Sequence, residues 1–178
     1  MIVAPDGTVV SNYPKHHLFF ADETWAEEGP SFHAFNLSLK NGLSLKVGCG
    51  ICKDIQPYSQ STPFTDFELA SFYEKEKCDL ILFSTAWVTK EPTETQQAAR
   101  KAELHSHWIS RLTPLMKGEK KVYFCAANRT GSEGGWKFLG CSCFFKFEPP
   151  SEPEVMDSLG IENQDSILHT LNYWSLQN

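Results

Sequence analysis

The sequence predicts one α/β domain, because strand patterns and a helix pattern alternate along it. Residues from Leu43 to Val47 alternate apolar and polar side chains, as a half-buried strand does. An amphipathic helix pattern follows Pro57 and Pro63, and the continuous apolar run from Leu80 to Ser84 then predicts a strand covered on both faces. A chain of 178 residues with 41% hydrophobic content is long enough for one such domain with a core.

The beginning of the chain and the first helix carry local signals. Asp6-Gly7 separates two short apolar runs, as the turn of a hairpin does. Thr65 and Glu68 have the spacing of a capping box, and the apolar face that follows runs to about Lys77. We therefore expect an N-terminal hairpin and a helix that begins near Thr65.

The second half continues the alternation. Apolar residues at helical spacing predict a helix from about Thr95 to Leu115. Beyond Glu148 the stretch Pro-Pro-Ser-Glu-Pro is typical of a connector. The remaining predicted elements are strands at 122–126 and 138–147, a flexible or ligand-lining loop at 128–135 between them, and a short strand candidate at 167–171.

Charge and hydropathy exclude several classes of partner. The net charge of -6 disfavours binding to phosphate backbones, so we expect no nucleic acid partner. The N-terminus has no secretory signal pattern, and the most apolar run is too short to cross a bilayer. The expectation is a cytoplasmic protein without a membrane contact, whose six cysteines are reduced.

Cys49 and Cys52 form a C-x-x-C pair, which can be a redox couple or half of a zinc site. A reactive pair obtains its low thiol pKa largely from a helix N-terminus, and two prolines soon after Cys52 prevent a long helix there. Zinc needs about four ligands, and the other close pair, Cys141 and Cys143, lies on a predicted strand. Both readings are weak, although redox chemistry stays an alternative.

A third reading makes Cys52 a nucleophile at the end of a strand. A thiolate attacks a carbonyl best with a backbone N–H to receive the oxyanion and a cation nearby. The N–H of Lys53 is the obvious donor, and Lys15 is the candidate cation. Taken alone, Lys15 would most often be a solvated surface residue.

Two motifs carry a family resemblance. Tyr13-Pro-Lys-His-His-Leu-Phe19 resembles the lysine motif of the nitrilase superfamily of carbon–nitrogen hydrolases, and Gly50-Ile-Cys-Lys-Asp54 resembles its cysteine motif. The two stand in the family's order. Within the superfamily the chain is similar to fungal protein N-terminal amidases, over stretches at 50–58, 63–68, 86–87, 128–133 and 138–140.

The resemblance implies a fold and a set of site residues. The fold is a four-layer α-β-β-α sandwich, incomplete here because its first part is missing; residues 1–148 would be the C-terminal portion of the hydrolase domain and 149–178 a connector and extension. Cys52 would be the nucleophile, Lys15 the oxyanion-stabilising lysine and Glu23 the accessory glutamate, with Glu27 and Glu28 as rivals. Substrate contacts would come from Asp54, Trp87 and Glu133.

The implied activity is hydrolysis of the side-chain amide of N-terminal Asn or Gln in proteins, through a Cys thioester, as in N-degron protein degradation. No metal or organic cofactor is implied, the partners would be protein or peptide N-termini, and a homo-oligomer is expected by analogy. The family's general-base glutamate lies upstream of the lysine motif, where this chain has a single carboxylate, Asp6. Alternatives are a noncatalytic binding remnant, a small-molecule amidase of the same superfamily, and the thiol-redox protein.

Overall fold

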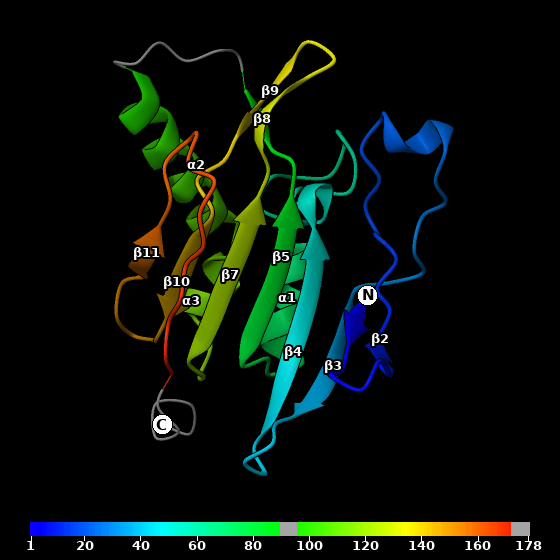
Figure 1. Cartoon of the computed structure of the whole chain (residues 1–178), viewed down its shortest axis with the longest axis vertical. Coiled ribbons are helices and arrows are strands. Elements are labelled where there is room, and N and C mark those ends of the chain that lie inside the picture. The colour runs from blue at the N-terminus through cyan, green and yellow to red at the C-terminus, as the bar shows by residue number, and fades with distance from the viewer. Residues whose placement is uncertain (90–95, 172–178) are drawn as a thin grey trace.

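The computed structural model describes residues 1–89 and 96–171. Its centre is a six-stranded mixed sheet in the order β11-β10-β7-β5-β4-β3 (Figure 1). Strands β4, β5 and β7 run parallel, and β3, β10 and β11 complete the sheet in antiparallel pairs. The strand bounds are β3 (His33–Ser38), β4 (Ser44–Ile51), β5 (Leu80–Thr85), β7 (Val122–Asn128), β10 (Cys143–Phe147) and β11 (Glu154–Ser158).

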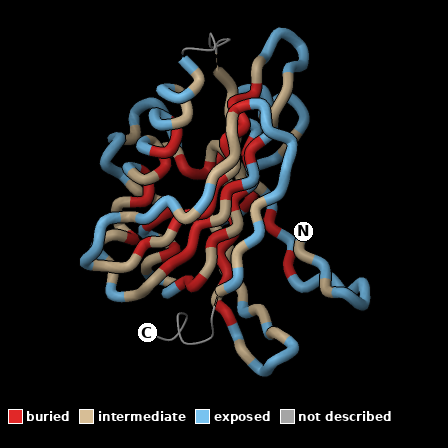
Figure 2. Tube along the Cα trace, turned by 60° about the vertical axis from the view of Figure 1, so that its left-hand side comes forward, coloured by how far each residue is buried: buried red, intermediate tan, exposed pale blue. Residues whose placement is uncertain are grey.

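Three helices form a layer on one face of this sheet, namely α1 (Glu68–Lys75), α2 (Gln97–Arg111) and α3 (Thr113–Met116) (Figure 1). The core lies between the helices and the strands, where Trp108, Tyr73 and Phe124 are fully buried. Figure 2 shows buried residues concentrated along the strands and on the helix faces turned toward them. Burial of these apolar side chains is the main force holding the two layers together.

Two small sheets flank the main one. The predicted hairpin is confirmed as β1 (Ile2–Val3) and β2 (Val9–Ser11), paired antiparallel around the Asp6-Gly7 turn. A second small sheet has the order β6-β9-β8, with β6 at Val88–Thr89, β8 at Thr130–Glu133 and β9 at Trp136–Leu139. The chain therefore has one main packed layer pair with smaller sheets at its margins.

The strands predicted at 43–47 and 80–84 are confirmed as β4 and β5, and β4 extends to Ile51. The first helix begins later than predicted, at Glu68 with Phe67 as its N-cap and no side-chain cap. The Glu68 carboxylate instead accepts the backbone N–H of Tyr58 at 3.0 Å. The capping-box interpretation of Thr65 was therefore wrong, because the glutamate is bound by another segment.

The second predicted helix is interrupted. Helix α2 ends at Arg111, and α3 begins at Thr113. Pro114 has no N–H for the Ser110 carbonyl, which accepts the Thr113 hydroxyl at 2.7 Å instead. The predicted start at Thr95 lies outside the described residues.

The strand predicted at 138–147 is two strands. Gly140 and Cys141 both have φ of 59°, in the left-handed region, and this turn separates β9 from β10. A Cβ at Gly140 would lie 2.2 Å from the Ile161 carbonyl oxygen, so glycine is required there. The predicted loop at 128–135 is instead largely a hairpin, in which β8 pairs with β9.

The C-terminal segment belongs to the packed structure further than predicted. Strand β11 extends the main sheet beside β10, and Ile161 is 3% exposed in the core. The domain boundary at 148 stays a prediction. Residues 167–171 form no strand, so that prediction was wrong. Within 1–89 and 96–171, no helix has both the length and the apolar character needed to cross a membrane.

Gly48 on β4 provides a test of the packing between sheet and helix. A Cβ at Gly48 would lie 2.5 Å from Cε1 of Tyr73, whose ring is fully buried. We expect Gly48→Ala to lower the free energy of unfolding by about 1–3 kcal/mol, measured by urea denaturation. Gly118→Ala is the matched control, because its Cβ would lie 3.3 Å from the partly exposed Glu74 side chain and no closer than 3.7 Å to the Leu115 carbonyl oxygen. Equal stability of both variants would contradict this packing.

Candidate active site

Cys52 lies where β4 ends, at the same edge of the sheet as the C-terminal ends of β5 and β7 (Figure 1). It begins a 3₁₀ helix at Cys52–Ile55 and has φ of 47°, in the left-handed region. For a non-glycine residue this conformation costs about 1–3 kcal/mol, and such strain clusters at functional sites. The half-buried thiol is thus presented on a sharp, strained turn, as predicted for a nucleophile.

Lys15 stands at the base of a loop that spans residues 15–29. Its ammonium contacts the Asp22 carboxylate, and Gly29 N–H donates to the Lys15 carbonyl at 2.8 Å. Asp22 also accepts the N–H of Phe19 at 3.1 Å. The Gly29 hydrogen bond therefore closes the loop at its two ends, and Asp22, from the middle of the loop, restricts the position of the Lys15 ammonium.

The carboxylate beside Lys15 is Asp22 and not the predicted Glu23. Both belong to the 3₁₀ helix Asp22–Thr24, but Glu23 is exposed and no recorded hydrogen bond joins it to Lys15. The rival Glu28 accepts the Tyr58 hydroxyl at 3.0 Å. Sequence reasoning missed Asp22 because adjacent carboxylates cannot be distinguished until the turn that orients them is known.

Asp54 occupies a different environment from the one predicted. Its side chain is completely buried, and both oxygens accept hydrogen bonds from groups of the chain itself. The donors are the Tyr13 hydroxyl at 2.8 Å and the backbone N–H groups of Ile51, His16 and His17 at 2.7, 3.1 and 2.7 Å. The chain's own donors thus occupy both oxygens of the buried carboxylate, which argues against the predicted substrate contact.

Lys53 lies close to the same cluster. Its ammonium donates to the carbonyls of Pro57 and Tyr58 at 2.9 and 3.0 Å. Burial lowers the pKa of Lys53, the Glu68 carboxylate opposes this shift, and the Lys15 ammonium lowers the pKa further. Lys15 is therefore within electrostatic range of the residue that follows Cys52.

Trp87 contacts His107, which is hydrogen-bonded to Gln56 next to the cysteine turn, and sequence reasoning missed this histidine. The Trp87 and His107 rings lie 5.3 Å apart, and Gln56 Nε2 donates to His107 Nε2 at 2.9 Å. Burial lowers the pKa of His107, and the Arg111 guanidinium lowers it further, which favours the neutral imidazole. The contact joins α2 to the turn, and no sequence spacing indicated it.

Glu133 is not brought to this cluster. It lies at the tip of the β8-β9 hairpin, where its exposed carboxylate pairs with Arg129. Asn128, from the same sequence stretch, has a structural role: its side-chain oxygen accepts the backbone N–H of Trp87 at 2.9 Å, and its side-chain amide donates to the Gly140 carbonyl. Glu133 as a substrate contact stays a prediction.

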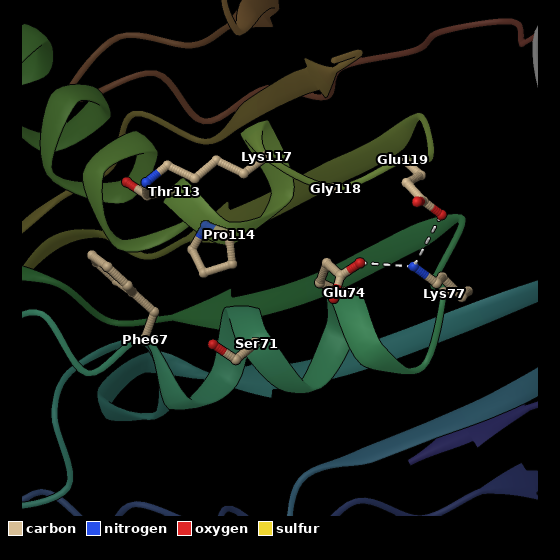
Figure 3. Close-up of a pocket in the computed structure, with 9 residues that line it drawn as sticks. All are labelled: Phe67, Ser71, Glu74, Lys77, Thr113, Pro114, Lys117, Gly118 and Glu119. Carbon is tan, nitrogen blue, oxygen red and sulfur yellow. Dashed lines mark hydrogen bonds and ion pairs between the residues drawn. The ribbon is translucent and has the colours of Figure 1, made fainter. Parts of the chain in front are cut away.

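A surface cavity of about 460 Å³ lies elsewhere, between α1 and α3 (Figure 3). Glu74, Lys77 and Glu119 form ion pairs along its wall, and none of the predicted site residues lines it. This cavity is therefore separate from the residues that carry the nucleophile chemistry. We identify the candidate site by the strained thiol and its neighbours, not by cavity size.

The alternative readings of the cysteines have little geometric support. Cys49 is buried on β4, burial raises the pKa of its thiol, and only a four-residue 3₁₀ helix follows the pair. A redox couple needs an accessible thiolate of low pKa. Across 1–89 and 96–171, no three His, Cys, Asp or Glu side chains gather into a group that could hold a metal ion.

Comparison with known proteins gives a consistent picture. No protein-family model matches the chain. The protein N-terminal amidase of Schizosaccharomyces pombe is 28% identical over 156 residues, covering 82% of this chain and 54% of the relative. The Saccharomyces cerevisiae enzyme of the same name is 25% identical, covering 99% of this chain and 40% of the relative. The chain thus spans about half the length of these relatives or less.

Solved structures show the fold. A crystal structure of an N-terminal amidase with an Asn-Glu-Ala peptide superposes with a TM-score of 0.72 at 19% identity, covering 90% of this chain and 70% of that one. This likeness confirms the predicted nitrilase-type α/β fold. The main sheet and the helices on one of its faces form one β layer and one α layer of that fold.

Proposed function

We propose, from the likeness to N-terminal amidases and from the arrangement around Cys52, that this chain carries the nucleophile and the oxyanion-binding lysine of an amidohydrolase. Its substrate would be the side-chain amide of Asn or Gln at the N-terminus of a peptide or protein. The observation that carries the proposal is the strained Cys52 turn, which the Asp54 hydrogen bonds join to the segment that carries Lys15, whose ammonium is bound by Asp22. The named relatives, including structures with peptides that begin with Asn or Gln, support this substrate class.

The reaction follows from these groups. The Cys52 thiolate attacks the side-chain amide carbon, and the oxyanion that forms is stabilised by the Lys15 ammonium and the Lys53 N–H. Lys53 stands in the first turn of a 3₁₀ helix, where N–H groups have no partner within the helix. The carbon–nitrogen bond then breaks, the nitrogen takes up the proton that the thiol lost and leaves as ammonia, and water hydrolyses the thioester to release the carboxylate product and restore the thiol.

One component of the reaction has no assigned residue. In the part of the chain that the structure describes, no carboxylate is recorded in a hydrogen bond with Cys52. General acid-base assistance typically contributes about a hundredfold to ten-thousandfold in rate. We therefore propose slow turnover for this chain by itself. A cytoplasmic location and a homo-oligomer also stay predictions.

The test uses the 178-residue chain and the peptide Asn-Glu-Ala. We expect conversion of the N-terminal Asn to Asp, with one ammonia per peptide, followed by mass spectrometry and an ammonia assay. Against a full-length N-terminal amidase the rate should be lower by about the general-base contribution of 10²–10⁴. The N-acetylated peptide, in which the N-terminus is blocked, is the matched control.

The outcomes separate the alternatives. Equal conversion of the acetylated peptide would contradict recognition of protein N-termini. Conversion of free small amides alone would favour a small-molecule amidase, and no conversion of any amide would contradict the proposed activity of this chain.

A further inference from the structure

Asp54 stands out because its fully buried carboxylate forms no ion pair with any residue of 1–89 or 96–171, although it interacts electrostatically with the Lys53 ammonium. Its charge is met by four hydrogen-bond donors from the protein itself. A buried charge is tolerated only where such donors satisfy it. The arrangement is therefore specific to an acid with two acceptor oxygens at this position.

The four donors come from the two segments that carry the candidate chemistry. Tyr13, His16 and His17 flank Lys15 on both sides, and Ile51 directly precedes Cys52. Oδ1 binds the N–H groups of His16 and His17, and Oδ2 binds the Tyr13 hydroxyl and the Ile51 N–H. One side chain thus joins segments that are some forty residues apart in the sequence, with separations of 37 to 41.

We propose that Asp54 is a positioning residue that sets the placement of the Lys15 backbone relative to the Cys52 turn. This inference rests on the proposed roles of Lys15 and Cys52. Asp54 itself does not contact substrate, because it is fully buried. It acts by fixing the peptide groups on either side of Lys15, so that the ammonium is close to the thiol before substrate binds.

A neutral amide cannot replace the carboxylate. In an Asp54→Asn variant one oxygen becomes an NH₂ group, which has no lone pair for the donors that face it. Either the two histidine N–H groups or the Ile51 N–H would then lose their acceptor. The segment that carries Lys15 would be released from the turn that carries Cys52, while the core of sheet and helices stays intact.

The experiment measures alkylation of Cys52 by iodoacetamide, quantified for each cysteine by peptide mass spectrometry. Proximity of an ammonium favours the reactive thiolate. We expect Asp54→Asn to slow alkylation of Cys52 about tenfold at pH 7, because the Lys15 ammonium is then no longer held near the thiol.

Asp79→Asn is the matched control. Asp79 is also a buried carboxylate that accepts a backbone N–H, from Lys46 at 2.7 Å, but it lies before β5, at the opposite edge of the sheet. This variant should leave the Cys52 rate unchanged. A wild-type rate in Asp54→Asn, or an equal slowing in Asp79→Asn, would overturn the proposal.

Loss of the fold gives a different signal. Unfolding would accelerate alkylation of the buried Cys78 and Cys141, whereas loss of positioning slows Cys52 alone. If Asp54→Asn unfolds, Tyr13→Phe decides the matter, because it removes one donor and keeps the carboxylate. A smaller slowing of Cys52 is then expected, and none would overturn the proposal.

Alkylation does not depend on turnover of an amide. If the chain releases no ammonia and Asp54→Asn still slows Cys52, the positioning role stands and the proposed function fails. If ammonia is released, Asp54→Asn should lower kcat with little change in KM, because it disturbs an interaction of the transition state.

Discussion

Cys52→Ala is expected to abolish release of ammonia from Asn- and Gln-initiated peptides, a loss of about a thousandfold or more. The reason is that the thioester cannot form without the thiolate, and no other group of the turn is a nucleophile of comparable strength. Alanine and cysteine have the same free-energy cost in the left-handed conformation at φ of 47°, so the thermal midpoint should not change. The measurement is an ammonia assay together with a thermal melt.

Cys125→Ala is the control for Cys52→Ala. Cys125 is also a free, half-buried cysteine, but it lies within β7, away from the strand end. Its replacement should leave the rate of ammonia release unchanged. Activity that survives Cys52→Ala would remove the amidase mechanism proposed for this chain.

Lys15→Met is expected to lower kcat by about 10²–10³ while KM changes little. The ammonium is proposed to bind the oxyanion, which exists only after attack, so its loss affects the transition state more than substrate binding. Methionine keeps much of the apolar stem and removes the charge. Steady-state kinetics with the Asn-Glu-Ala peptide would give both parameters.

Lys53→Met is the matched control for the charge. Lys53 is adjacent to the nucleophile, but its ammonium is engaged by the carbonyls of Pro57 and Tyr58. Its backbone N–H, the proposed oxyanion donor, is kept in the variant. We expect kcat to stay near the wild-type value. A loss as large as that of Lys15→Met would mean that general positive charge, and not the placed Lys15 ammonium, supports the reaction.

Much of the architecture was predictable from local patterns. The hairpin at Asp6-Gly7, the strands at β4 and β5 and the helix between them follow from periodicity and turn residues, which act within a few residues of the chain. The predictions failed where a residue's conformation depends on a contact with a residue outside its local segment. Glu68 is bound by the N–H of Tyr58 and so does not close a capping box, and the turn at Gly140 is required by the Ile161 carbonyl.

The α/β class, the position of Cys52 at a strand end and the choice of Lys15 as its candidate cation were predictable from the amino-acid sequence, because motif order and side-chain chemistry are properties of the linear chain. Three further features became visible only in the folded chain: Asp22 contacts Lys15, His107 contacts the cysteine turn, and Asp54 is buried between the two motifs. These facts depend on hydrogen bonds between residues up to 51 positions apart, which fold geometry selects and sequence spacing does not encode.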